Sequence, residues 1–188
     1  MAPADDMAAS VGVASLAVRD GPAALFARCV FVLAVFAATG CSQADTGAVK
    51  DNACGPIRRQ QAQPNSVVHV LPGGGDPAYV SDPPTSGPHV AIPRGETVYH
   101  EPLSRPTQVG ILERGDVLLQ YRAADVDADG IATLETLAGP TVAIAPNPDL
   151  PDPVVASAWV YLRSCQRVDE AALRSFIEER QGKGPGGH

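Results

Sequence analysis

A short apolar segment near the N-terminus determines which part of this chain is expected to form the folded domain. Arg19 and Arg28 precede the run CVFVLAVFAA at 29–38, and two small residues then lead to Cys41. Basic residues, a short apolar run and small residues before the cleavage position are the layout of a secretory signal. The run has about ten residues, whereas a membrane-spanning helix needs about 20. We therefore expect residues 1–40 to be a signal peptide, with an uncleaved N-terminal anchor as the alternative.

The tetrapeptide that ends at Cys41 reads ATGC and resembles a lipoprotein processing site, although Ala38 stands where Leu is usual. In such a site the cysteine is lipidated and becomes the new N-terminus, which holds the domain at a membrane surface without spanning it. We expect lipidation of Cys41, and ordinary secretion is the alternative. The membrane is then one partner, reached through the lipid, and the sequence leaves open which protein or small molecule is another.

Export also determines how the remaining cysteines are interpreted. With Cys29 in the signal and Cys41 used for the lipid, Cys54 and Cys165 remain as an even pair. In an oxidising compartment such a pair is expected to form a disulfide. On the chain-entropy model, closing a loop of about 110 residues stabilises the fold by about 4–5 kcal/mol. Two unpaired buried thiols are the alternative.

The rest of the chain is long enough for one domain. We expect a tether at 41–53, a single extracytoplasmic domain at 54–181 and a Gly-rich tail at 182–188. The formal net charge of −7 argues against nucleic acid as a partner, because such partners require a basic face. The 18 Gly and 18 Pro favour turns and short strands over long helices.

The apolar patterns predict an α+β fold. The clearest strand is 116–122, DVLLQYR, which we expect to be central in the sheet. A short helix is expected at 131–137, with Asp129 as its N-cap and Gly139 at its end, and a C-terminal helix at 169–180 with one apolar face. Other strands are expected at 66–71, 97–101, 141–145 and 154–162, with a short one at 78–80. The predicted architecture is a small, mostly antiparallel sheet with a short helix and a C-terminal helix packed on it.

The segment most suited to carrying chemistry is a proline-rich loop. It consists of Pro83, Pro84, Thr85, Ser86, Gly87, Pro88 and His89 and is called the motif loop below. Three prolines fix its backbone at low entropic cost, so it could present His89 as a metal ligand or as an acid/base group. The alternative is a turn in which Ser86 and His89 form only local hydrogen bonds.

At this motif the sequence resembles a bacterial family known as domain of unknown function 3105, whose members are often exported or membrane-attached. The resemblance runs roughly from His69 to the C-terminus. It continues through Gly95, Tyr99, Leu112-Glu113-x-Gly115, the strand ending at Ser157-Ala158-Trp159, and 169–177. It implies no activity.

The resemblance also implies a polar cluster that this chain has partly lost. Members show His-x-x-Glu-His-Gly where 110–115 here reads GILERG, so both histidines of that cluster are absent. With the histidines matching His69 and His89, those residue types suggest a site for zinc or another divalent transition metal. Only His69, His89 and Glu113 remain of the set. Arg114 opposes metal binding, because a guanidinium beside Glu113 would bind its carboxylate and repel a cation.

Other candidate sites have weaker signals. His100, beside Tyr99, could replace a lost ligand, but a lone surface histidine is more often solvated. Asp125, Asp127 and Asp129 precede Gly130 as in the first half of a calcium loop, but Thr136 stands where the closing Glu is required. We interpret this segment as an acidic connection that caps the next helix.

The sequence does not favour an enzyme. A Ser86 and His89 dyad lacks an evident third group to orient it, and the sequence shows no phosphate-binding or dinucleotide-binding motif. We therefore expect a non-catalytic binding or scaffolding lipoprotein at the cell surface. The alternative is an extracytoplasmic metal-binding domain that uses His69, His89 and Glu113.

Overall fold

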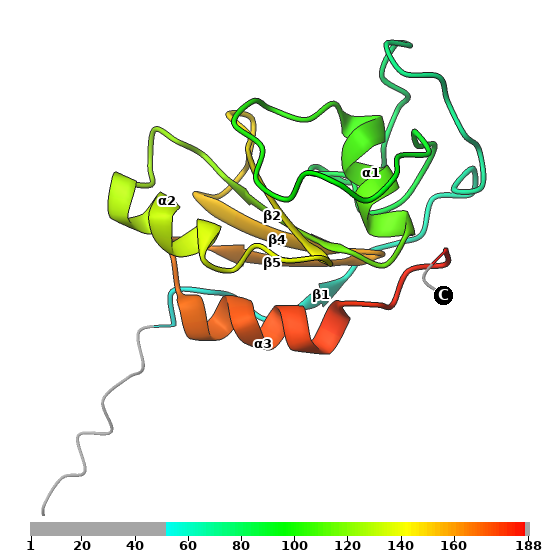
Figure 1. The fold of residues 1–188 in the computed structure, drawn as a ribbon. Helices are drawn as coiled ribbons and strands as arrows, with labels where there is room; N and C mark the ends of the chain where they lie inside the picture. The colour runs from blue at the N-terminus through cyan, green and yellow to red at the C-terminus, as the bar shows by residue number, and fades with distance from the viewer. Residues whose placement is uncertain (1–51, 187–188) are drawn as a thin grey trace, which may run out of the picture. The chain divides into compact units, whose positions relative to one another are not determined.

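The computed structural model describes residues 52–186 of the chain, which form a mixed sheet with helices on both faces (Figure 1). The expected signal peptide, lipidation at Cys41 and most of the tether lie outside these residues. In the described part the strands are β1 (Arg58–Arg59), β2 (Val117–Tyr121), β3 (Val142–Pro146), β4 (Val154–Ala158) and β5 (Tyr161–Cys165). The helices are α1 (Arg105–Glu113), α2 (Ala128–Glu135) and α3 (Glu170–Arg180).

The strands lie in the order β1-β5-β4-β2-β3. The pairs β1–β5, β5–β4 and β4–β2 are antiparallel, and β2–β3 is parallel. The parallel pair requires a crossover connection, and α2 lies within it. The expected α+β fold with a mostly antiparallel sheet is therefore confirmed. Strand β2 lies between β4 and β3 and all five of its residues are buried, in line with an interior position.

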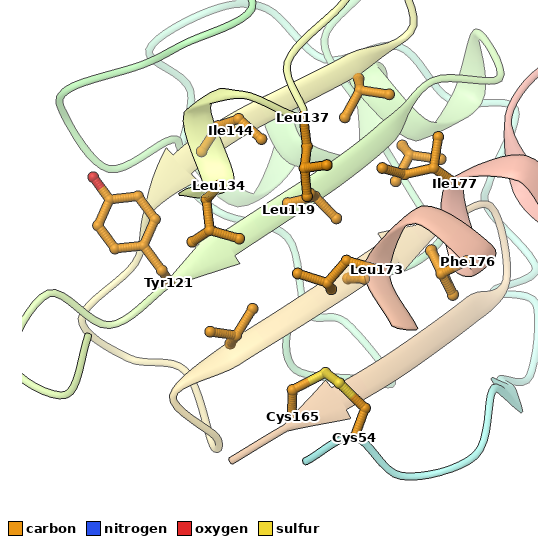
Figure 2. Close-up of a cluster of buried hydrophobic side chains, with 14 of the residues drawn as sticks. Cys54, Leu119, Tyr121, Leu134, Leu137, Ile144, Cys165, Leu173, Phe176 and Ile177 are labelled. Carbon is orange, nitrogen blue, oxygen red and sulfur yellow. A yellow bond between two sulfur atoms is a disulfide. The ribbon is translucent and has the colours of Figure 1, made fainter. Parts of the chain in front are cut away.

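One face of the sheet is covered by α3 and α2 (Figure 2). Helix α3 begins where the sequence predicts, because the Asp169 side chain accepts a hydrogen bond from the Ala172 amide at 3.0 Å. Its Leu173, Phe176 and Ile177 lie at helical spacing and pack against Leu119 of β2. Burial of this stripe fixes α3 on the sheet.

The opposite face is covered by α1, which the sequence analysis missed. Ile111 and Leu112 of α1 pack on Leu118 of β2. A start signal was present in the sequence. Ser104 is the N-cap and accepts from the Thr107 amide, and Pro106 stands in the first turn, where a missing amide hydrogen costs nothing.

The expected single strand at 154–162 is wrong, because the chain folds there into the β4–β5 hairpin. Its turn contains Val160, which has φ of 54°, a conformation that β-branched residues rarely adopt. Two neighbouring segments hold this turn. The Val160 amide donates to the Thr85 carbonyl at 3.0 Å, and the Val160 carbonyl accepts from the Gln60 amide at 2.8 Å.

Three other expected strands are absent from the described part of the sheet. Segment 66–71 is a turn region with one bridge from His69, segment 97–101 has one bridge from Val98 to Ile144, and segment 78–80 has none. Val67 is 87% exposed, so the β-branched run has no buried face to stabilise it as a strand.

Helix α2 starts earlier than predicted. Its N-cap is Asp127, whose side chain accepts from the Gly130 amide, and Asp129 lies in the first turn. The helix ends at Glu135, before Gly139. Each carboxylate could have capped a helix, and the sequence alone did not distinguish them.

The disulfide between Cys54 and Cys165 is confirmed. The two cysteines also form an antiparallel bridge at the end of β5, so residues 52–63, called the N-terminal arm below, are covalently attached to the sheet. Within 52–186, none of the helices has the length and apolar character needed to cross a bilayer.

Candidate functional site

The motif loop is buried throughout, which is unusual for so polar a segment. Thr85 is fully buried, and Ser86 and His89 are each 2% exposed. The Ser86 hydroxyl accepts a hydrogen bond from the Gln63 amide at 2.9 Å, and the Thr85 carbonyl accepts from the hairpin turn at Val160. The loop therefore connects the N-terminal arm to the end of the sheet.

Tyr79 covers the outer side of the motif loop. Its hydroxyl donates to the Pro88 carbonyl at 2.7 Å. Its ring lies so close to Gly87, which has φ of 128°, that a Cβ there would meet it at 2.9 Å. Burial raises the pKa of Tyr79 to about 12, with a further increase from Asp76 and an opposing decrease from Arg105. The hydroxyl is thus held in its protonated, donating form.

The residue after the loop joins it to α1. The Val90 amide donates to the Pro106 carbonyl at 3.1 Å. A Cβ on Gly110 would lie 2.2 Å from the Val90 carbonyl oxygen, closer than any real contact. Gly110 is therefore required for α1 to approach the backbone that follows the loop.

His89 has one nitrogen in use and one free. Its Nδ1 lies 3.0 Å from the Gly87 carbonyl oxygen. Because a carbonyl can only accept, Nδ1 carries the hydrogen and, in the neutral ring, Nε2 is left with a lone pair. This Nε2 is buried and has no hydrogen-bond partner among the described residues. Such a lone pair is suited to bind a metal.

His69 is brought next to His89, as the set of expected ligands requires. The backbones form a parallel bridge, in which the Val70 amide donates to the His89 carbonyl at 2.8 Å and the His89 amide to the Val68 carbonyl at 3.0 Å. The two ring centroids are 4.7 Å apart and the ring planes are at 89°. His69 is exposed, so the pair extends from the interior to the surface.

Glu113 does not complete this pair. It ends α1, its carbonyl accepts from the Gly186 amide at 2.9 Å, and its carboxylate lies beside Gly186. Across 52–186, no three His, Cys, Asp or Glu side chains are grouped closely enough to hold a metal ion. The three-residue site of His69, His89 and Glu113 is thus not formed. His100 is exposed and does not join it.

Arg114 binds Asp116, although we expected it to hold Glu113. Its Nε donates to Asp116 Oδ2 at 2.5 Å. Arg94 donates to Asp116 Oδ1 at 3.0 Å from Nη2, and Asp116 is only 2% exposed. Arg114 also donates to the Pro93 carbonyl at 2.8 Å. This carboxylate shared by two guanidinium groups fixes the segment between the motif loop and α1, and no sequence motif indicated it.

The three aspartates of the calcium-like segment have other roles. Asp125 pairs with Arg122, Asp127 caps α2, and the carbonyl of Asp129 accepts from the Thr133 hydroxyl. They line a cavity of about 450 Å³. These interactions support the interpretation as a capping connection.

Buried polar side chains are also found on the sheet face under α1. Gln120 is fully buried, and its amide oxygen and nitrogen have no hydrogen-bond partner among the described residues. Ser157 on β4 is 1% exposed and its hydroxyl is likewise unpartnered there. Strand alternation places both on the face of Leu118. A glutamine inside the apolar run VLLQY was the sequence signal for this feature.

Comparison with known proteins identifies the family. Residues 61–187 match the family described as protein of unknown function (DUF3105). The chain belongs to this family. The match begins before His69 and includes the motif loop, so the expected membership is confirmed. No curated protein and no solved structure matches the chain. Membership in DUF3105 supplies no activity.

Proposed function

We propose that this member of DUF3105 is an exported lipoprotein whose folded domain is a non-catalytic binding or scaffolding module at the cell surface. The observation that carries the proposal is the burial of the motif loop. The Ser86 hydroxyl already accepts a hydrogen bond from the Gln63 amide, and Ser86 and His89 are each only 2% exposed, so neither is presented to a substrate as a nucleophile or base.

The motif loop also supports a binding role through what it holds in place. The Ser86 side chain bonds the N-terminal arm at Gln63, the Thr85 carbonyl bonds the hairpin turn, and Val90, directly after the loop, bonds α1. The segments on either side of it, 64–82 and 91–104, are mostly exposed. Irregular segments held on a rigid frame are a common arrangement in binding proteins.

The cellular address is tested with Cys41→Ser. In cells fed an alkyne-bearing fatty acid, we expect the wild-type protein to be labelled and to sediment with membranes. The variant should be unlabelled, because it lacks the thiol that carries the lipid. A Cys29→Ser variant serves as the control, and we expect it to behave as wild type. Equal labelling of the Cys41→Ser variant would contradict lipidation at this residue.

A second candidate function is metal binding by the pair His69 and His89. It is favoured by the buried, unpartnered Nε2 of His89 next to the His69 ring. Two imidazoles with the remaining positions open are compatible with copper, nickel or zinc. Glu113 plays no part in this version of the site.

Metal analysis of the purified protein by inductively coupled plasma mass spectrometry separates the two candidates. His69→Ala is the informative variant, since His69 is exposed and its loss should leave the fold intact, and His100→Ala is the matched control. About one equivalent of metal that is lost only in His69→Ala would establish the metal site. Absence of metal from the wild type after incubation with copper, nickel and zinc would leave the binding module without metal.

A further inference from the structure

We propose that a small acidic cavity beside the motif loop binds a primary ammonium group. The cavity has a volume of about 140 Å³, and its lining includes Asp76, Asp82, Leu103, Arg105, Gln108 and Asp149. These residues come from the segment before the motif loop, from the start of α1 and from the loop after β3. The inference rests on the proposed binding role, because it names a ligand class for it.

Gln108 supplies the buried end of the site. The residue is 4% exposed, and its Nε2 donates to the Leu103 carbonyl at 2.9 Å. That bond fixes the orientation of the amide, since a flipped amide would set two oxygens against each other. The atom left over is therefore Oε1, which has no hydrogen-bond partner among the described residues. A buried acceptor of this kind is stabilised by a ligand that donates an N–H.

The charges around the cavity favour a cation. Asp82 pairs with Arg105 at 2.6 Å, which neutralises one carboxylate. Asp76 and Asp149 have no ion pair in the described part of the chain. The N-terminus of α1 adds only about half a positive charge, so the cavity retains a negative balance. This balance disfavours phosphates and carboxylates.

The volume of the cavity and the hydrogen-bond acceptors that line it favour an ammonium group over other cations. At ~30 Å³ for each water molecule, the volume corresponds to about five waters, which is too small for a nucleotide or a sugar ring. An inorganic cation is disfavoured because no three acidic, His or Cys side chains within 52–186 are grouped for metal binding. A primary ammonium on a short alkyl chain has three donors, one for Gln108 Oε1 and two for carboxylates. Leu103 offers apolar contact for the alkyl part.

The test uses n-butylammonium as the probe and nuclear magnetic resonance of the ¹⁵N-labelled protein as the readout. We expect saturable shifts of the Gln108 side-chain amide, and none with n-butanol, which has the same chain without the charge. Asp149→Asn keeps the shape and removes one charge, and it should weaken binding about tenfold, as for loss of one charged hydrogen bond. The control is Asp152→Asn, since Asp152 bonds Gln166 outside the cavity, and its affinity should equal that of the wild type.

Two results would overturn the proposal. One is a set of shifts that rises linearly without saturation, and the other is equal affinity of the Asp149→Asn and Asp152→Asn variants. A lysine residue blocked at both its amino and carboxyl ends distinguishes the sources of the ammonium. Binding at least as tight as that of butylammonium identifies a lysine side chain as the ligand, and much weaker binding identifies a free small amine. If n-butylammonium did not bind while Cys41 was still labelled with lipid, the ammonium site would be rejected and the proposed lipoprotein would not.

Discussion

At the scale of single residues, Tyr79 has the most informative contacts. Its hydroxyl donates to the Pro88 carbonyl at 2.7 Å and its ring lies against Gly87. Tyr79→Phe keeps the ring and removes the hydrogen bond, so we expect a loss of about 1 kcal/mol in the free energy of unfolding. Urea denaturation measures this loss. Tyr161→Phe is the matched control, because the face of its ring contacts Arg180, and it should change stability by less than about 0.5 kcal/mol.

The same residue makes stability depend on alkaline pH. The pKa of Tyr79 is raised from 10.0 to about 12 in the folded protein. A group whose pKa is higher in the folded state stabilises the fold fully below the unfolded pKa and loses that effect as the pH rises through the folded value. Melting temperature should therefore fall between pH 10 and 12, and fall less steeply in Tyr79→Phe. Identical profiles for the two proteins would contradict this role.

Single-residue roles were the least predictable part of the site. The sequence placed His69 and His89 together through a family resemblance, and the structure does bring their rings within 4.7 Å. It could not show that Arg114 would bind Asp116, because both Glu113 and Asp116 are close along the chain. Helix α1 ends at Glu113, and Arg114, which follows it, pairs with Asp116 and not with Glu113. Only the three-dimensional structure shows which of the two carboxylates Arg114 binds.

At the scale of elements, the contact between α1 and the segment after the motif loop depends on Gly110. Glycine to alanine in a helix usually stabilises by about 1 kcal/mol. Here the added Cβ would meet the Val90 carbonyl oxygen at 2.2 Å, and backbone atoms cannot move aside as a side chain can. We expect Gly110→Ala to destabilise the protein by roughly 1–3 kcal/mol, measured by thermal unfolding.

The control for this prediction is Gly95→Ala. A Cβ at Gly95 meets nothing within 4 Å, so its effect should stay within about 0.5 kcal/mol. If Gly110→Ala proved as stable as the wild type, α1 would have to sit farther from Val90 than the structure places it.

Elements with a strong local pattern were predictable and the others were not. The run DVLLQYR and the stripe of α3 gave β2 and α3 nearly at their observed bounds, because burial selects the same period that the sequence displays. The β4–β5 hairpin was missed because its turn uses Val160 at positive φ, where turn residues such as Gly or Asn are expected. Long-range bonds to Thr85 and Gln60 stabilise that turn, and no local signal encodes them.

At the scale of the whole molecule, the bridge from Cys54 to Cys165 spans a sequence separation of 111. Opening this loop, by a reductant or by paired Cys54→Ala and Cys165→Ala substitutions, should lower the free energy of unfolding by about 4–5 kcal/mol. Guanidinium denaturation with and without reductant measures the difference. Adding reductant to the double variant should have no further effect, and a reduced wild type as stable as the oxidised one would contradict the prediction.

The hairpin turn at Val160 has a further consequence, for the order in which the protein can fold. The segments that hold it, Gln60 and the motif loop at Thr85, leave the ribosome long before the turn itself. Until then the Thr85 carbonyl of the motif loop lacks the hydrogen bond that the Val160 amide donates to it in the folded protein. We therefore expect the chain to stay unfolded through most of its synthesis and to fold late and slowly, since non-local contacts must form together. A polypeptide that stays unfolded during synthesis can still be bound by cellular components that act on unfolded chains.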